Sequence, residues 1–537
     1  QHLWARNDEA LPIALHHGSL SREARQKVEA AMVAGHLRAI VATGSLDLGI
    51  DWGDVDLVVQ VGAPKNVKRL VQRIGRANHR YNAPSRAVLV PSNRFELLEC
   101  HAALAAVRDH DLDGEPRGPG PLDVLCQHIL LTACAAPFDA SALFAEVRTA
   151  GRYRRLARAD FDACLAYCAT GGYALQAYDR WQRLVEKDGR WQLRDPRRAR
   201  TIRMNVGTIV STELLKVRLK GRTGTPLGEI EEDFAASLTP GDTFLFGGET
   251  VRYESLREMT VEVTRQASTN PKVAVYAGTK LATSTLLSHR VIALLADPEA
   301  WTTLPAYMRD WLTLQAETSR LPRPGTLLAE TFPRGPLHHL CLYGFAGRNA
   351  HQTLGLLLTR RMETAGLDPT GFVANDYTLL VSGLTEVPDP AALLAPQGLR
   401  DGLEGWLGEN AVMKRTFRDV AVVAGLIERN LPGARKSGRQ ATFSSDILYD
   451  TLRRYDPDHL LLRMTREEAG RGLVDFGRIE EMLARSHGRV EHVRAPHVTP
   501  LAAPLFLEMG RVPIRGRAEA RLVAEAARAL LAEAGLA

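Results

Sequence analysis

Two short stretches of the chain hold the residue types that phosphate chemistry requires. The first, residues 41–51 (VATGSLDLGID), follows a predicted strand and is rich in glycine and small hydroxyl residues. Such a turn exposes backbone N–H groups at the carboxyl edge of a parallel sheet, where an anion or a phosphodiester can bind. A tight turn between a strand and a helix has the same composition, so this stretch alone fits both readings.

The second stretch, residues 72–80 (QRIGRANHR), lies at the end of a predicted helix. Arg73 and Arg76 are three residues apart and therefore share one helical face. A guanidinium group keeps its charge and matches phosphate oxygens with two donors, so a rigidly held pair can stabilise a phosphoryl group during its transfer. The alternative reading is a solvated basic helix.

The elements that must position these residues form an alternating pattern up to about residue 92. Short apolar, β-rich runs typical of buried parallel strands occur at residues 12–16, 37–42, 55–61 and 86–90. A helix with Ser21 as its N-cap is expected between the first two runs. The alternation predicts a parallel sheet with helices outside it, and a complete lobe of this kind would need another strand–helix unit in front.

Beyond residue 92 the predicted secondary structure changes in type several times along the chain. A Gly/Pro-rich linker at residues 111–123 precedes two helices and a hairpin with its turn at Asp188-Gly189, which together describe a winged helix. Residues 201–290, beginning with TIRMNVGTIV, are strand-rich and predict a small antiparallel sheet or barrel. Mixed helix and strand patterns follow, and the last 22 residues read as an amphipathic helix. Asn375-Asp376-Tyr377 lies at a predicted strand–turn, without an assignable chemistry.

Composition sets wider bounds. With 537 residues the chain is too long for a single hydrophobic core and should divide into several domains. Its net charge of +6 is compatible with nucleic-acid binding without being diagnostic of it. No apolar run is long enough to span a membrane. The six cysteines form no C-x-x-C pair, which favours a reduced, cytoplasmic compartment and speaks against a metal site. The first residues lack an initiator Met and the features of a signal peptide, so we expect the chain to start inside a domain.

In order and spacing, residues 16–22 (HHGSLSR), 41–51 and 72–80 resemble motifs IVa, V and VI of the second RecA-like lobe of superfamily 2 helicases. The run at residues 42–80 is similar to the Lhr (large helicase-related) pattern, including the Gly-x-Pro before the motif VI helix. Later phrases such as GRNAHQTLGLLLTRRME and HVTPLAAPLFLEMGR resemble the ligase-associated DEXH-box branch of that family. The likeness covers nearly the whole chain. In motif VI, Asn78-His79 stands where many superfamily 2 members have Gly-Arg.

The resemblance implies a role for individual residues. Arg76 is expected to be the arginine finger, with Arg73 as its companion on the γ-phosphate of ATP. The residues expected to approach the nucleotide are Gly49, Asp51 and Gln72. Those expected to contact the DNA backbone are His17, Gly18, Thr43, Gly44 and Ser45.

Basic and aromatic residues outside the lobe suit single-stranded DNA, because bases stack on rings and phosphates pair with arginine. The residues expected to make these contacts are Arg155, Trp181, Arg198 and Tyr276. Three of them also have a structural alternative: Trp181 can pack the hairpin, Tyr276 can be a core residue, and Arg198 can belong to a solvated face. Lys216, Arg218, Lys220 and Arg222 alternate along a strand and share one face. They could follow DNA or protect an edge strand.

The fold class is therefore expected to be multidomain α/β. The expected parts are a second RecA-like lobe with a parallel sheet (1–95), a helix and linker (96–122), a winged helix (123–200), a small antiparallel β domain (201–325) and a C-terminal α/β domain (326–537).

The expected function is that of an ATP-dependent DNA helicase moving 3′→5′ in DNA repair. These 537 residues hold no G-x-x-x-x-G-K-[ST] and no DEAH or DEVH tetrad. ATP and Mg²⁺ would therefore be held mainly by a missing first lobe, and this chain alone should not hydrolyse ATP. Expected partners are single-stranded DNA, or a DNA or RNA duplex with a single-stranded tail, and a DNA ligase and a nuclease of the same pathway. The alternatives are a non-catalytic nucleic-acid-binding module and an RNA helicase.

Overall fold

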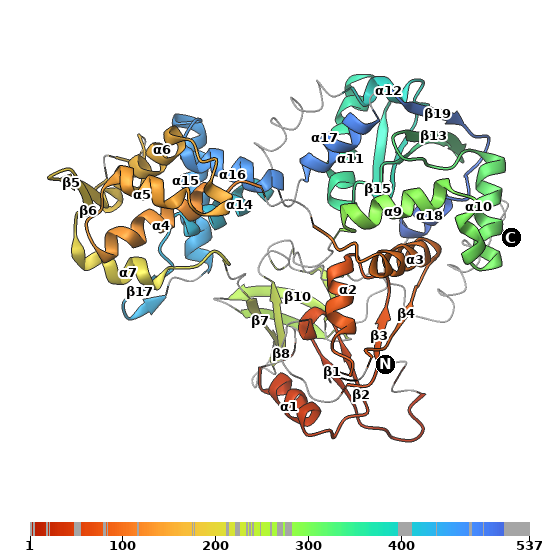
Figure 1. Ribbon diagram of the computed structural model, residues 1–537, viewed down its shortest axis with the longest axis horizontal. Helices are drawn as coiled ribbons and strands as arrows, with labels where there is room; N and C mark the ends of the chain where they lie inside the picture. The colour runs from red at the N-terminus through yellow and green to blue at the C-terminus, as the bar shows by residue number, and fades with distance from the viewer. Residues whose placement is uncertain are drawn as a thin grey trace. The chain divides into compact units, whose positions relative to one another are not determined.

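The structure is a computed structural model of the chain (Figure 1). It describes residues 3–509 apart from 4–5, 18–19, 21, 48–54, 79–81, 83, 115–117, 174, 177, 211–213, 221–225, 232–234, 236–237, 239–240, 247–248, 258–259, 266–271, 274–281, 396–410, 436–437, 472–474 and 487. The chain divides into two compact units, each assembled from separate stretches. The first unit contains residues 1–114, 212–393 and 482–537, and the second contains residues 115–211 and 394–481.

The N-terminal part of the first unit has the predicted strand–helix alternation. Strands β1 (Ile13–His16) and β2 (Ala39–Ala42) pair in parallel, as do β3 (Val58–Val61) and β4 (Ala87–Val90). Helix α1 (Arg22–Val33) connects the first pair and α2 (Val67–Ile74) connects the second. The predicted parallel strands are therefore confirmed. The expected N-cap, Ser21, lies outside the described residues.

Two side chains cap the start of helix α3 (Arg94–Arg108). Asn93 Oδ1 accepts from the backbone N–H of Glu96 at 2.9 Å, and Glu96 Oε2 accepts from the backbone N–H of Ser92, the residue before the N-cap, at 2.8 Å. Helices α2 and α3 share one hydrophobic core with α9 (Thr285–Ala296), α10 (Ala306–Thr318) and the C-terminal sheet. Fully buried residues of this core include Val67, Leu70, Leu98, Val291 and Leu312. The helicase-like segment and the C-terminal sheet are thus packed as one body.

The C-terminal sheet has the strand order β15-β16-β14-β13-β19. Its strands are β13 (Leu327–Arg334), β14 (Leu337–Tyr343), β15 (Pro369–Ala374), β16 (Leu379–Gly383) and β19 (Val490–Arg494). Pairing is antiparallel except between β13 and β19. Helix α11 (Arg348–Thr364) packs on β15 and β16, and α12 (Pro390–Leu393) and α18 (Ala503–Met509) complete the described helices of this region.

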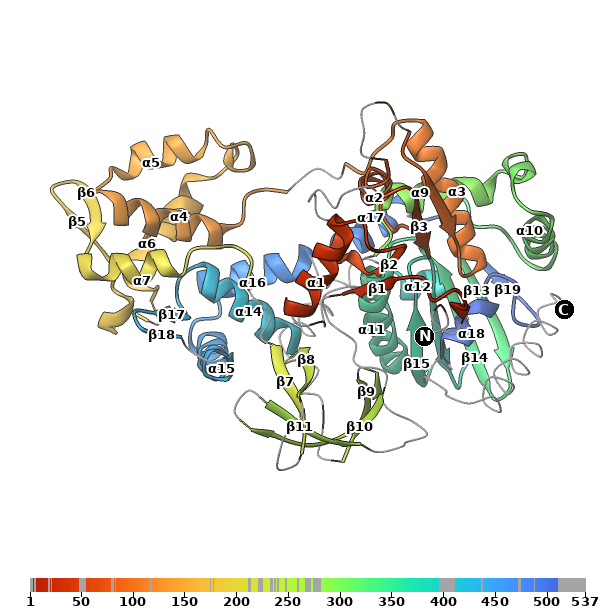
Figure 2. The ribbon, with the colours of Figure 1, turned by 90° about the horizontal axis from the view of Figure 1, so that it is seen from below.

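A second sheet of the first unit has its own hydrophobic core and the order β12-β9-β10-β11-β7-β8. Five of its strands are labelled in Figure 2: β7 (Leu214–Leu219), β8 (Pro226–Glu231), β9 (Thr243–Phe246), β10 (Glu249–Arg257) and β11 (Thr260–Arg265). The sixth is β12 (Lys272–Val273). Three pairs are antiparallel, as predicted: β7 with β8, β9 with β10 and β10 with β11. By contrast, β7 pairs with β11 and β9 with β12 in parallel. The sheet is therefore mixed, because intervening strands act as crossovers between these two pairs.

The second unit contains the winged helix. It comprises α4 (Leu122–Ala135), α5 (Ala140–Val147), α6 (Arg158–Thr170), β5 (Leu184–Lys187) and β6 (Arg190–Leu193), with 3-10 turns at Gly151–Tyr153, Asp179–Trp181 and Pro196–Arg198. Asp188 and Gly189 have φ angles of 52° and 73°, so the hairpin turn forms where the Asp-Gly dipeptide predicts it. Residues 201–204, expected as strand, instead end α7 (Ala199–Met204), and that expectation is wrong. Asp195 caps the preceding 3-10 turn with Pro196 at its first position, and the helical path continues into α7.

Helices from the C-terminal part of the sequence pack against the winged helix. These are α14 (Ala411–Val423), α15 (Gly438–Tyr455) and α16 (Leu460–Arg471), with the short pair β17 (Asn430–Leu431) and β18 (Ala434–Arg435). Along the sequence, the second unit ends and the first resumes within helix α17 (Phe476–Arg485). None of the described helices is long and apolar enough to cross a membrane.

Candidate nucleotide and nucleic-acid interface

Helix α2 carries the arginine stretch, and its first turn is fully capped. Asn66 Oδ1 accepts from the backbone N–H of Arg69 at 3.0 Å. Asp113 Oδ2 accepts from the N–H groups of Val67 and Lys68 at 2.5 and 3.0 Å. A buried carboxylate at this end also interacts favourably with the helix dipole. The start of α2 is therefore fixed by side chains on both sides of it.

The other end of α2 leads into a turn that holds Arg76. The N–H of Arg76 donates to Arg73 O at 3.0 Å, and that of Asn78 donates to Val55 O at 2.7 Å. Ala77 is fully buried, and Asn78 has a φ of 49° and donates from Nδ2 to Pro84 O at 2.9 Å. The half-buried Arg76 is therefore tied to the end of α2 through its own N–H, and Asn78 two residues later ties the turn to neighbouring segments.

Arg73 joins the two stretches that the sequence singles out. Its Nε and Nη2 donate to the two carboxylate oxygens of Asp47, both at 2.7 Å, and its Nη1 donates to Gln60 Oε1 at 2.7 Å. The pair is only partly exposed, at 23% for the Arg73 side chain and 15% for that of Asp47. Of these three residues, only Arg73 was predicted from the sequence as a site residue. The planar guanidinium thus holds the loop after β2 against α2.

The ends of β1 and β2 lie at one edge of their parallel pair, where His16 is in register with Ala42. His16 is buried, and its Nδ1 lies 2.8 Å from Ser45 Oγ and its Nε2 lies 3.0 Å from Glu29 Oε1. The predicted contact residues around it differ in exposure: Thr43 and Gly44 are exposed, whereas His17 and Ser45 are half-buried. The buried His16 therefore connects this edge of the sheet to Ser45 and Glu29. The residue predicted from the sequence was its neighbour His17.

Several predicted residues receive no geometry here. Gly18, Gly49, Asp51 and Tyr276 lie outside the described residues. Gln72 is exposed on α2.

In the second unit, the predicted DNA-contact residues have different surroundings. Arg155 is exposed. Trp181 is only 6% exposed and packs edge-to-face on Tyr178, with ring centroids 5.2 Å apart. A ring buried in this way offers no face for a base, so the structure corrects the predicted stacking role of Trp181 in favour of hairpin packing. Arg198 is half-buried, and its Nη2 lies 2.9 Å from Glu428 Oε1.

The basic face of β7 is present among the residues described. Lys216, Arg218 and Lys220 are exposed, with Lys220 Nζ 3.6 Å from Glu254 Oε2, and Arg222 lies outside the described part. Strand β7 lies between β11 and β8, so the alternative of a charge-protected edge strand is wrong.

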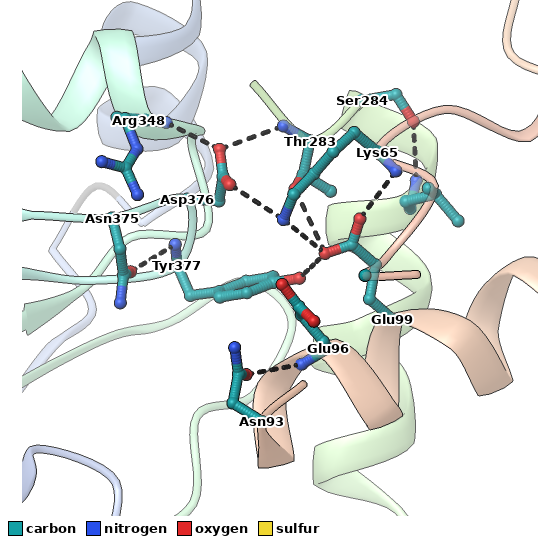
Figure 3. A network of polar contacts seen from close by, with 12 residues as sticks. Lys65, Asn93, Glu96, Glu99, Thr283, Ser284, Arg348, Asn375, Asp376 and Tyr377 are labelled. Carbon is teal, nitrogen blue, oxygen red and sulfur yellow. Dashed lines mark hydrogen bonds and ion pairs between the residues drawn. The ribbon is translucent and has the colours of Figure 1, made fainter. Parts of the chain in front are cut away.

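A buried polar network lies beside the start of α2 and was not predicted from the sequence (Figure 3). Lys65 Nζ lies 2.9 Å from Glu99 Oε2 and 3.1 Å from Asp376 Oδ2. Tyr377 OH donates to Glu99, and burial raises the pKa of Tyr377 well above its ordinary value. The Asn375-Asp376-Tyr377 turn, which had no assigned chemistry, thus belongs to the surroundings of the arginine-bearing helix.

Sequence models of three families match consecutive parts of the chain. The helicase conserved C-terminal domain matches residues 1–81, the winged helix domain of the large helicase-related protein matches residues 105–273, and the DEAD/H associated domain matches residues 321–502. Residues 1–81 include both arginine and glycine-rich stretches of the site.

Known proteins resemble the chain over most of its length. The ATP-dependent helicase Lhr-Core protein 2 of Thermococcus barophilus is 30% identical over 499 residues, which cover 88% of this chain and 57% of that protein. The ATP-dependent helicase Lhr-Core of Methanocaldococcus jannaschii is 24% identical over 536 residues, or 96% of this chain and 62% of that protein. The chain thus spans less than two thirds of these relatives.

Among solved structures, the Mycobacterium smegmatis helicase Lhr bound to single-stranded DNA and AMP-PNP matches with a TM-score of 0.67 and 27% identity. The match covers 94% of this chain and 63% of the solved one. The multidomain α/β fold agrees with that structure, and the winged helix with the matching family model. The chain therefore belongs to the Lhr (large helicase-related) family of helicases.

Proposed function

We propose that this chain is the arginine-finger portion of an ATP-dependent DNA helicase that moves 3′→5′ along single-stranded DNA. In the whole protein, a first lobe holds the phosphates of ATP and Mg²⁺, and this chain supplies the second lobe and the accessory domains. The motif VI and V stretches act together at the nucleotide.

The observation that carries the proposal is the bridge between the two stretches. Arg73 binds Asp47 with two 2.7 Å hydrogen bonds, so the loop after β2 and the end of α2 move as one piece. Arg76 follows directly in a turn whose backbone is held on both sides. A guanidinium in so rigid a setting is suited to stabilising charge on a transferring phosphoryl group.

The residues keep the roles that the family resemblance implies, with Arg76 as the finger and Arg73 as its companion. Arg73 already uses three of its donors within the chain, so it orders the loop as well as facing the nucleotide. Gly49, Asp51 and Gln72 approach the nucleotide. ATP supplies the free energy that opens and closes the cleft between the two lobes.

Single-stranded DNA passes the edge formed by the ends of β1 and β2. His17, Gly18, Thr43, Gly44 and Ser45 contact its phosphates there. Farther along the chain, the exposed Arg155, together with Arg198 and Tyr276, extends the contact. Phosphate contacts carry no sequence information, so movement is largely independent of sequence and sensitive to salt.

The biological process is DNA repair, with a DNA ligase and a nuclease as partners, a proposal that rests on the ligase-associated resemblance. A non-catalytic role as a single-stranded nucleic-acid-binding module is the second candidate. It is favoured for the 537 residues by the absence of a phosphate-loop motif within them.

The test is strand displacement by a version of the chain extended N-terminally with a first lobe. Duplexes with a 3′ or a 5′ single-stranded tail, made as DNA–DNA and DNA–RNA, distinguish direction and the nature of each strand. We expect ATP-dependent displacement from the 3′-tailed substrate in which the tailed strand is DNA. Displacement only along an RNA strand would indicate an RNA helicase. Tight binding without displacement of any substrate would indicate the binding module.

A further inference from the structure

Lys65 has an unusual backbone conformation directly before the arginine-bearing helix. Its φ is +61°, in the left-handed region that a residue with a Cβ rarely adopts. Such a conformation persists only where the surroundings determine it. Here the backbone N–H donates to Glu99 Oε1 at 3.0 Å, and the carbonyl oxygen accepts from Ser284 N at 2.9 Å.

The ammonium group of Lys65 is held as firmly as its backbone. It contacts Glu99 Oε2 at 2.9 Å, Asp376 Oδ2 at 3.1 Å and Thr283 Oγ1 at 3.4 Å (Figure 3). Glu99 is fully buried and Asp376 is 6% exposed. Charges removed from water to this extent require partners, so this arrangement tolerates little displacement.

The two carboxylates have supports of their own. Asp376 Oδ1 accepts from the N–H groups of Thr283 and Arg348 at 3.0 and 3.2 Å. Asn375 Oδ1 accepts from Tyr377 N at 2.9 Å, which fixes the turn between β15 and β16 that presents Asp376. Tyr377 OH donates to Glu99, and its ring stacks on Phe95 of α3 at a centroid distance of 5.1 Å. The contacts form an unbroken path from the DEAD/H associated domain to Lys65.

The protonation states agree with an ion pair. Burial alone would lower the pKa of Lys65, but its attraction to Glu99 and Asp376 outweighs this effect and raises the pKa. Burial would likewise raise the pKa of Asp376, yet the charge of Lys65 and two backbone donors lower it. Burial raises the pKa of Glu99. The pKa shifts of Lys65 and Asp376 therefore both favour the charged forms of these two groups.

A small change in the position of Lys65 would displace the far end of α2, where Arg73 lies. The helix begins one residue after the Asn66 cap and has eight residues, so its length is about 12 Å. A tilt of about 5° at its start moves its end by about 1 Å, and a misplacement of about 1 Å can cost a catalytic group about a hundredfold in rate.

We propose that Lys65 is a positioning residue for Arg73 and Arg76, through which Asp376 of the DEAD/H associated domain sets the placement of α2. The hydrophobic core shared by α2, α3 and the C-terminal sheet already supplies cohesion. Lys65 additionally fixes the orientation of α2, because its backbone N, its carbonyl O and its Nζ are all held beside the helix start. The inference rests on the proposed function of the two arginines.

The test uses Asp376→Asn, Lys65→Met and Lys65→Arg. Asp376→Asn keeps an oxygen for the two backbone donors and removes only the charge, so it should fold even if Lys65→Met does not. Arg320→Gln is the matched control, because it breaks a charge pair of the same compact unit, with Glu491, in which the Arg320 side chain is 63% exposed. Hydrogen exchange is measured on the 537-residue chain, and ATP turnover and single-stranded DNA affinity on the version extended with a first lobe.

We expect exchange of the α2 amides to become about tenfold faster in Asp376→Asn, and kcat to fall about tenfold with unchanged KM for ATP and unchanged DNA affinity. Lys65→Met should lower kcat in the same way, whereas Lys65→Arg should keep most of it. The Arg320→Gln control should match the unaltered chain. Unchanged α2 exchange and kcat in a folded Asp376→Asn would overturn the inference. A uniform rise in exchange across the domain would also overturn it, since that is the mark of a merely structural role. Absent turnover by the unaltered extended protein would refute the proposed function instead, while α2 exchange would still decide the role of Lys65.

Discussion

Replacing Asp47 by Ala should loosen the loop after β2 together with α2. The Asp47–Arg73 pair has two charge-assisted hydrogen bonds of 2.7 Å, and its side chains are 15% and 23% exposed. Exposed ion pairs contribute about 0.2–1 kcal/mol, whereas removing one partner of a buried pair costs about 3–5 kcal/mol. For this partly buried pair we expect a cost of about 2 kcal/mol, which corresponds to a factor of about 30 in a local opening equilibrium.

A local probe is needed because the chain has several domains and need not unfold in one step. Hydrogen exchange read by mass spectrometry on peptides covering residues 39–47 and 67–74 reports each segment separately. In Asp47→Ala, both segments should exchange faster by a similar factor, although they are distant in sequence. A double-mutant cycle with Arg73→Ala should show a coupling energy of about 2 kcal/mol.

Asp162→Ala is the matched control. Arg158 Nε donates to both oxygens of Asp162, at 2.9 and 3.1 Å, but the side chains are 48% and 50% exposed. The expected cost for this exposed pair is less than about 0.5 kcal/mol. The reasoning is refuted if Asp47→Ala leaves both segments unchanged, or if only the loop loosens while α2 keeps its protection.

Three further predictions concern other parts of the chain. Burial lowers the pKa of His339 to about 4. In the unfolded chain this imidazole is protonated below about pH 6.5, whereas in the folded chain it stays neutral down to about pH 4. The free energy of unfolding should therefore fall by about 2 kcal/mol between pH 7.5 and pH 5. Denaturant unfolding at the two pH values should show this loss, and His339→Gln should remove it. Arg155→Ala should weaken single-stranded DNA binding and reduce the slope of log K against log salt by about 0.7, whereas Trp181→Ala should lower stability by about 3 kcal/mol, seen by thermal unfolding, without a change in that slope. If the β7 face follows DNA, joint replacement of Lys216 and Arg218 by Gln should reduce the slope by about 1.4 in the same titration.

Local patterns predicted the parts of the fold that depend on local chemistry. The four parallel strands occur at apolar β-rich runs, and the hairpin turns at Asp188-Gly189, where two positive φ angles are needed. The error at residues 201–204 has a local cause as well. Thr201 and Ile202 are β-branched and favour strand, but the cap at Asp195 and the proline after it start a helical path that continues into α7.

The contacts that organise the candidate site were harder to predict, because they join residues far apart in the sequence. Arg73 was identified from its spacing to Arg76, yet Asp47 is 26 residues away and has no local feature that marks it as the partner. Glu99 and Tyr377 are 278 residues apart. Trp181 illustrates the opposite difficulty, since a tryptophan beside a wing has the same local sequence whether its ring is buried or exposed.

The central claim is that Arg76 stabilises the transferring phosphoryl group of ATP. The most direct measurement is single-turnover ATP hydrolysis by the chain extended with a first lobe, with and without single-stranded DNA, for the unaltered protein and for Arg76→Ala. The account predicts DNA-stimulated hydrolysis that Arg76→Ala lowers by about a thousandfold with nucleotide affinity nearly unchanged, and no hydrolysis by the 537 residues alone. Full hydrolysis by Arg76→Ala, or a loss explained entirely by weaker ATP binding, would contradict it.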